Sequence, residues 1–122
     1  MNISLDTPHA DYFIKSYRPG CLRLNTGECD QSVILYESKC LDFPPHSINE
    51  LKAEHLLPLV SLQPNIVILG TGPRHIFPSH KILAPLIEAR IAVEIMHTEA
   101  ACRTYNILVS EGRDVLAALI VS

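Results

Sequence analysis

Short apolar runs separated by turn residues characterise the first 45 residues, a pattern that is typical of β-strands. Three of these runs predict strands, over residues 12–17, 21–25 and 32–37. Turns are predicted between them at Arg18-Pro19-Gly20 and at Thr26-Gly27-Glu28. The double proline in residues 41–45 predicts an extended connector, because proline has no backbone N–H for a helix or for strand pairing.

Apolar residues take up a helical spacing after Ser47. Ser47 and Glu50 lie three residues apart, as in a capping box, and predict the start of a helix that Pro58 should end or kink. Thr98 is the candidate N-cap of a later helix. The second half as a whole predicts strands over residues 65–69, 91–96 and 115–121 and helices over residues 79–90 and 98–110. This β-α-β-α-β alternation predicts crossover connections and a substantially parallel sheet covered on both faces.

Composition narrows the class of protein. The chain has 122 residues, 48% of them hydrophobic, and a formal net charge of −3, which fits a single domain over residues 1–122 without a basic surface for nucleic acid. Residues 1–15 contain no basic segment followed by an apolar one, so a secretory signal is not expected. No apolar run approaches the roughly 20 residues that a transmembrane helix needs. We therefore expect a soluble, cytoplasmic protein.

The cysteines suggest no metal site. Cys21, Cys29, Cys40 and Cys102 include no C-x-x-C pair, so structural zinc is not expected and the thiols are interpreted as reduced, small hydrophobic groups. Cys102 falls on the apolar face of the helix predicted over residues 98–110, and we expect it to be buried and inert. Motifs of serine hydrolases, zinc proteases and P-loop proteins are absent from the sequence, and we expect no cofactor.

The stretch from Ile66 to His80 raises the question of a ligand-binding loop, since an apolar strand there ends in Gly-Thr-Gly. A dinucleotide fingerprint needs a third glycine where this chain has His75, so a nicotinamide or flavin site is not expected. Ligands of open α/β sheets bind beyond the carboxyl ends of the parallel strands, which leaves an anion-binding crevice as a candidate. The candidate residues of this crevice are Gly70, Thr71, Gly72, Arg74, Glu94, His97, Thr98 and Arg103. The simpler interpretation is that the glycines only turn the chain and that Arg74 is solvated.

Glu94 lies inside a predicted strand, where a carboxylate is costly unless it is paired or protonated. It is a candidate general acid or base, although we favour a structural hydrogen bond or exposure at a sheet edge. Arg103 follows Glu99 by four residues on a predicted helix and can pair with it. Because Glu94 has only Arg74 as another evident partner, we expect Arg103 to reach the crevice and to pair with Glu94.

Several motifs of the second half, taken together, point to one family. They are Gly70-Thr71-Gly72, Phe77-Pro78 and the runs over residues 93–98, 101–108 and 111–113. These motifs resemble a small domain family of unknown function that includes the mitochondrial respiratory complex I assembly factor three and many bacterial proteins. The resemblance implies a three-layer single α/β domain with a mixed, largely parallel central sheet, and it implies no established enzyme activity. His97 stands where that family usually has Asp or another small polar residue.

Two functions of different classes follow from this. The first is a non-catalytic accessory or assembly-type protein that acts through contacts with a partner protein of unknown identity, as the resemblance implies. The alternative is a binder of a small anionic metabolite, or an enzyme acting on one, with its site at the strand-end crevice.

Overall fold

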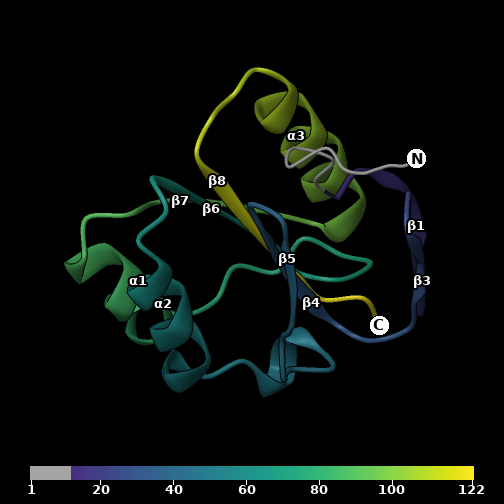
Figure 1. Ribbon diagram of the computed structural model, residues 1–122. Helices are drawn as coiled ribbons and strands as arrows, with labels where there is room; N and C mark the ends of the chain where they lie inside the picture. Colours follow the sequence, from purple (N-terminus) through teal and green to yellow (C-terminus); the bar gives the residue numbers. More distant parts are fainter. Residues whose placement is uncertain (1–11) are drawn as a thin grey trace.

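Two β-sheets organise residues 12–122, the part of the chain that the computed structural model describes (Figure 1). The expectation about a secretory signal concerns residues 1–15 and falls mostly outside this part. A small antiparallel sheet has the order β1-β2-β3 and consists of β1 (Ile14–Arg18), β2 (Cys21–Leu24) and β3 (Gly27–Cys29). The larger sheet has the order β5-β4-β8-β6-β7. Its strands are β4 (Val33–Tyr36), β5 (Lys39–Asp42), β6 (Ile66–Gly70), β7 (Ala92–Met96) and β8 (Val115–Leu119).

The larger sheet is mixed, which confirms the predicted fold class. Strands β7, β6 and β8 run parallel to one another, as expected from the two strand-helix-strand units. Strand β4 pairs antiparallel with β8, and the β4–β5 hairpin extends the sheet on that side. Parallel pairing is therefore confined to the second half of the chain, and the strand-rich first half supplies the antiparallel edge.

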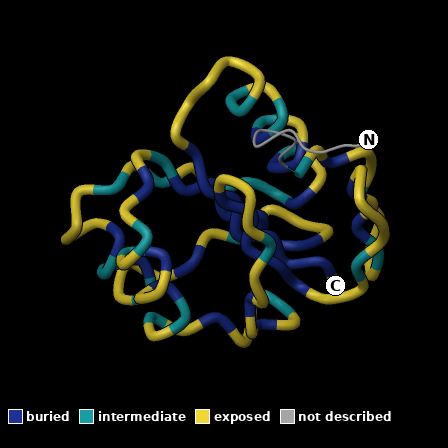
Figure 2. The backbone as a smooth tube through the Cα atoms, in the orientation of Figure 1, coloured by how far each residue is buried: buried dark blue, intermediate teal, exposed yellow. Residues whose placement is uncertain are grey.

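Each face of the larger sheet is covered, which produces three layers (Figure 1). Helix α3 (Thr98–Ser110) and the small sheet pack on one face. Helices α1 (Leu57–Leu62) and α2 (His80–Glu88) pack on the other. Strand β8 contributes to both cores in alternation and is buried along its whole length, as Figure 2 shows for the centre of the molecule. Burial on both faces explains why its sequence is continuously apolar.

Helix α3 joins the small sheet to the larger one. Ala101, Cys102 and Tyr105 lie on its buried face, which confirms the predicted burial of Cys102. Asn106 on the same helix is half-buried and binds the backbone of β1. Its Oδ1 accepts a hydrogen bond from the Ile14 N–H at 3.0 Å, and its Nδ2 donates to the Ile14 carbonyl at 2.7 Å. One side chain thus completes both backbone hydrogen bonds of a strand residue.

The helix predicted from Ser47 is wrong in its details. Ser47 makes no side-chain cap, and Glu50 accepts a hydrogen bond from the His46 N–H at 2.9 Å instead of forming a capping box. Only short 3-10 turns, Ile48–Glu50 and Ala53–Leu56, precede α1. Pro58 lies in the first turn of α1 and does not end the helix, because a residue there has no intrahelical partner for its N–H.

Two other boundaries differ from the predictions. Strand β3 occupies part of the turn predicted at residues 26–28, since the backbone of Gly27–Cys29 pairs with β2 without any apolar alternation. The connector predicted over residues 41–45 begins later, because Leu41 and Asp42 still pair with β4. Both are edge strands, where pairing on one side alone is enough for a short exposed segment to be extended.

Candidate functional site

The buried hydroxyl of Thr98 holds together the carboxyl ends of three strands. It accepts a hydrogen bond from the Gly72 N–H at 2.8 Å and donates one to the Ile120 carbonyl at 2.7 Å. The Thr98 N–H donates in turn to the Gly72 carbonyl at 2.8 Å. The loop after β6, the start of α3 and the residue after β8 are therefore linked by one fully buried side chain. Thr98 was predicted as the N-cap of α3, but it is the first residue of the helix.

The two glycines of the loop have different physical roles. A Cβ on Gly70 would lie 2.9 Å from the Thr98 hydroxyl oxygen and 3.1 Å from a methyl group of Leu119, so only glycine lets the strand approach the helix this closely. Gly72 has φ of 97°, a conformation that other residues rarely adopt. Between them, the Thr71 hydroxyl donates to the Arg74 carbonyl and accepts from the Ile76 N–H. The Thr71 hydroxyl is therefore bound to the backbone of its own loop on both sides.

The N-terminus of α3 is also occupied by the protein itself. His97 is the N-cap, and its Nδ1 accepts a hydrogen bond from the Ala100 N–H at 3.3 Å. The Ala101 N–H donates to the His97 carbonyl, and the Thr98 N–H is already engaged. Of the four amides that have no partner within the helix, those of Thr98 and Ala100 are thus bound, and the Glu99 carboxylate stands in the first turn. A helix terminus in this state offers little to an anion.

The charged candidates do not converge on the crevice. Arg103 pairs with Glu99 at 3.9 Å, and both side chains are about two-thirds exposed, so the expected pairing of Arg103 with Glu94 is wrong. Glu94 is exposed on β7, the edge strand of the larger sheet, which is the alternative that the sequence favoured for it. Arg74 is exposed in the loop, as the simpler interpretation predicted. The crevice therefore brings together Gly70, Thr71, Gly72, His97 and Thr98 without Arg74, Glu94 or Arg103.

Two adjoining hollows lie beside this region, and sequence reasoning identified neither. The first has a volume of about 440 Å³ and the second about 300 Å³. They share Tyr17 and Arg18 at the end of β1. The first is completed by Pro19, Pro73, His97 and Glu99, and the second by Ser16, Cys21, Arg23 and Glu28. Their walls come from the small sheet and the start of α3, segments that only tertiary packing brings together.

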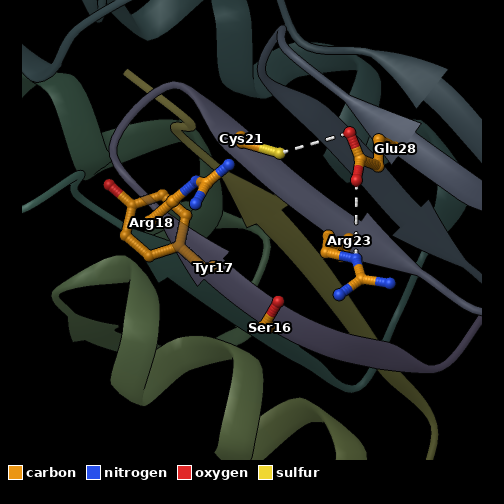
Figure 3. Close-up of a pocket in the computed structure, with 6 residues that line it drawn as sticks. All are labelled: Ser16, Tyr17, Arg18, Cys21, Arg23 and Glu28. Atoms are coloured by element: carbon orange, nitrogen blue, oxygen red, sulfur yellow. Dashed lines mark hydrogen bonds and ion pairs between the residues drawn. The ribbon is translucent and has the colours of Figure 1, made fainter.

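Tyr17 and Arg18 differ in how they are held. The Tyr17 hydroxyl donates to the Ser122 carbonyl at 2.9 Å, and burial is the main cause that raises its pKa above the ordinary value. Arg18 makes no ion pair with any residue from 12 to 122, whereas Arg23 pairs with Glu28 at 3.5 Å (Figure 3). The one sequence signal for this region is an aromatic residue followed by a cation immediately before a Pro-Gly turn.

Two further titratable groups have a pKa raised by burial. Burial raises the pKa of the Cys102 thiol to about 12, in line with its predicted inertness. Burial and a 2.7 Å hydrogen bond to Asp114 raise the pKa of Tyr36 above its ordinary value. Within residues 12–122, no three His, Cys, Asp or Glu side chains gather in an arrangement that could hold a metal ion.

Known proteins resemble the chain in sequence and in fold. It is 31% identical to a protein of Francisella tularensis named 13 kDa major membrane protein, over 98% of this chain and 99% of that one. It is 33% identical to the NADH dehydrogenase (ubiquinone) 1 alpha subcomplex assembly factor 3 of Danio rerio, over 88% of this chain and 63% of that longer protein. A crystal structure from Bordetella parapertussis, 29% identical, superposes with a TM-score of 0.85 and covers 93% of this chain and 98% of the other.

The Francisella tularensis relative is named a membrane protein. None of the helices within residues 12–122 has the length and apolar character needed to cross a membrane. The family itself is defined by its sequence model, which matches residues 14–120 and is described as a protein of unknown function (DUF498/DUF598). Since that match covers almost the whole chain, and the relatives include the complex I assembly factor 3 that the resemblance predicted, the protein belongs to the DUF498/DUF598 family.

Proposed function

We propose that this protein is a non-catalytic accessory factor of the assembly type, which acts by holding a partner protein. The observation that carries the proposal is the mutual hydrogen bonding at the strand-end crevice. A ligand site or an active site needs polar groups that are vacant or that bind water. At the crevice the Gly72 amide of the loop is bound by Thr98, and the Ala100 amide of α3 is bound by His97. The similarity to complex I assembly factor 3 supports the same class of function, although this chain spans only 63% of that relative's length.

The two hollows around Tyr17 and Arg18 are the surface that we propose for the contact. Arg23 and Glu99 are each paired within the chain, whereas Arg18 has no ion-pair partner in residues 12–122. A guanidinium group of this kind binds a carboxylate in two parallel hydrogen bonds. The proposed partner therefore presents an acidic side chain to Arg18, and the half-buried ring of Tyr17 supplies apolar contact beside it.

Affinity purification with a matched pair of variants tests this proposal. Arg18→Glu reverses the charge in the hollow, and Lys81→Glu makes the same change on α2, on the opposite layer of the molecule. We expect one partner at stoichiometric yield with the wild type and with Lys81→Glu, and at least a tenfold lower yield with Arg18→Glu, which corresponds to a loss of about 1.4 kcal/mol. Recovery of no stoichiometric partner from the native host would contradict the assembly-type role. Equal recovery with both variants would exclude the Arg18 surface.

The alternative function, a binder of a small anion at the crevice, is tested by a thermal-shift screen of phosphates and carboxylates. A ligand present at 100 times its dissociation constant stabilises a protein by about 2.7 kcal/mol, which is easily detected as a rise in melting temperature. We expect no such rise, because an anion would have to displace hydrogen bonds that the protein makes to itself. A rise that His97→Ala abolishes would favour the alternative.

A further inference from the structure

The second hollow has a cysteine thiol in its wall. Cys21 is half-buried at the start of β2, where the neighbouring Leu22 points into the core. Because side chains alternate along a strand, Cys21 lies on the outer face of the small sheet. Its thiol donates a hydrogen bond to Glu28 Oε1 at 3.8 Å (Figure 3). The sulfur therefore faces the hollow of about 300 Å³ rather than the core.

Positively charged side chains flank this thiol on two sides. Arg18 is directly opposed to Cys21 in the pairing of β1 with β2, and directly opposed residues have Cβ atoms about 4.5–5.5 Å apart. Arg23 lies two residues further along β2 and so shares the outer face with Cys21. Both arginines line the same hollow as the thiol (Figure 3). A small anion that enters the hollow meets two guanidinium groups beside the sulfur.

The other three cysteines are placed differently. Cys29 and Cys40 are each opposed to a fully buried leucine in their ladders, and both pack against the core between the sheets and α3. Cys102 is buried on α3. All four thiols are free, and burial raises the pKa of these three. An open hollow and flanking cations therefore distinguish Cys21 from every other thiol of the chain.

We propose that the second hollow is a thiol-modification site, in which Cys21 forms a mixed disulfide with a small anionic disulfide of the oxidised glutathione type. Each half of such a compound carries carboxylates, and a guanidinium group binds a carboxylate in two parallel hydrogen bonds. Arg18 makes no ion pair within residues 12–122. Arg23 pairs with Glu28 at 3.5 Å, but both side chains are more than half exposed, so replacing Glu28 by a carboxylate of the ligand costs little.

The reaction is one exchange at sulfur. Glu28 accepts the proton of the Cys21 thiol while the Cys21 sulfur attacks one sulfur of oxidised glutathione. The disulfide bond of the reagent breaks, and the glutathione thiolate that leaves takes the proton from Glu28. One protein thiol and one oxidised glutathione become one mixed disulfide and one reduced glutathione. The residues that line the hollow include no second cysteine to displace the bound group, so an external thiol is needed to remove it.

The site goes beyond the proposed protein contact and does not depend on it. The exchange needs only residues of this chain and a small molecule. The bound group would lie beside Arg18, which the two hollows share. A test without any partner protein therefore separates a failure of this site from a failure of the proposed function.

Reaction rates with a charged and a neutral disulfide test the site in the full chain. The reduced protein is treated at about pH 8, near the ordinary pKa of a thiol, with substoichiometric amounts of either reagent. The dianionic reagent is bis(carboxynitrophenyl) disulfide, and the neutral one is dipyridyl disulfide. The modified cysteine is mapped by mass spectrometry, and the same mapping is done after treatment with oxidised glutathione. We expect Cys21 to be modified first by all three compounds.

Matched double variants then test the part played by the arginines. Arg18→Ala/Arg23→Ala should lower the ratio of the anionic to the neutral rate by about tenfold, the lower end of the range for electrostatic attraction into a charged cleft. Lys52→Ala/Lys81→Ala removes the same charge from the opposite layer of the molecule and should leave the ratio unchanged. Raising the salt concentration to about 1 M should lower the ratio in the wild type as well, which requires no variant to fold.

Three results would overturn the proposal. The first is that another cysteine reacts before Cys21. The second is that oxidised glutathione leaves Cys21 unmodified. The third is that the ratio of the two rates depends neither on salt nor on the two arginines.

Discussion

Removing the hydroxyl of Thr98 while keeping its shape provides the strictest test of the strand-end junction. Thr98→Val leaves the Gly72 N–H and the Ile120 carbonyl without their 2.8 Å and 2.7 Å partners. Thr98 is fully buried, so water does not replace the lost group. Each buried polar group left unsatisfied costs about 1–3 kcal/mol, and two of them give an expected loss of about 2–6 kcal/mol in the free energy of unfolding. This is a large part of the 5–15 kcal/mol that is typical of a domain.

Chemical denaturation followed by circular dichroism measures this loss, provided that the dependence of the free energy on denaturant concentration is unchanged. Thr104→Val is the matched control, because Thr104 is half-buried on the same helix. Among residues 12–122, its hydroxyl is hydrogen-bonded only to the sulfur of Met96, at 3.4 Å. We expect the control to lose less than about 1 kcal/mol, since sulfur is a weak acceptor. If Thr98→Val loses no more than the control, the junction does not hold the strand ends together and the reasoning fails.

Three further changes test the packing around this junction. Gly70→Ala would place a methyl group 2.9 Å from the Thr98 hydroxyl oxygen and should cost about 1–3 kcal/mol in denaturation experiments. Asn106→Ala removes both hydrogen bonds to Ile14 and should lower the free energy of unfolding by about 1–2 kcal/mol. Amide hydrogen exchange should become faster in β1 alone. Unchanged exchange in β1 would contradict the role given to Asn106. Arg103→Ala breaks the exposed pair with Glu99 within α3 and should cost at most about 0.5 kcal/mol in the free energy of unfolding. A loss above about 2 kcal/mol would contradict the exposed position of this pair.

The sequence was sufficient for the fold class because the second half carries strong local signals. The strands over residues 66–70 and 92–96 and the helix over residues 98–110 were predicted nearly to their ends. Strand β3 has no such signal, because Gly27–Cys29 is short, exposed and extended only through pairing with β2. Pro58 misled the prediction for a different reason. The sequence does not show whether a proline falls in the first turn of a helix, where it is tolerated, or in the interior, where it ends or kinks the helix. Pro58 falls in the first turn of α1.

The candidate site was predictable only in part, because its residues are related through space. Thr98 directly precedes a helical pattern, which is the sequence signature of an N-cap. Its actual partners, Gly72 and Ile120, lie 26 and 22 residues away along the chain. Arg18 is separated from His97 in the same way, and only the docking of the small sheet against α3 brings them to one hollow. Local periodicity carries no information about such contacts.

The Gly-Thr-Gly loop therefore has a structural explanation that weakens its appeal as a binding site. An anion in the crevice would have to replace the Thr98 hydroxyl as the acceptor of the hydrogen bond from the Gly72 N–H. The fully buried hydroxyl oxygen of Thr98 would then lose its hydrogen-bond donor. The anion would meet the Glu99 carboxylate in the first turn of α3, where the helix dipole already favours that negative charge. Displacing the existing bonds costs about 1–3 kcal/mol for each group left unpaired, before any contact with the ligand compensates. At Arg18 no such cost arises, because the guanidinium group is exposed and makes no ion pair within residues 12–122. A partner's carboxylate at Arg18 would break no ion pair among the described residues, which supports the surface with the two hollows as the proposed contact.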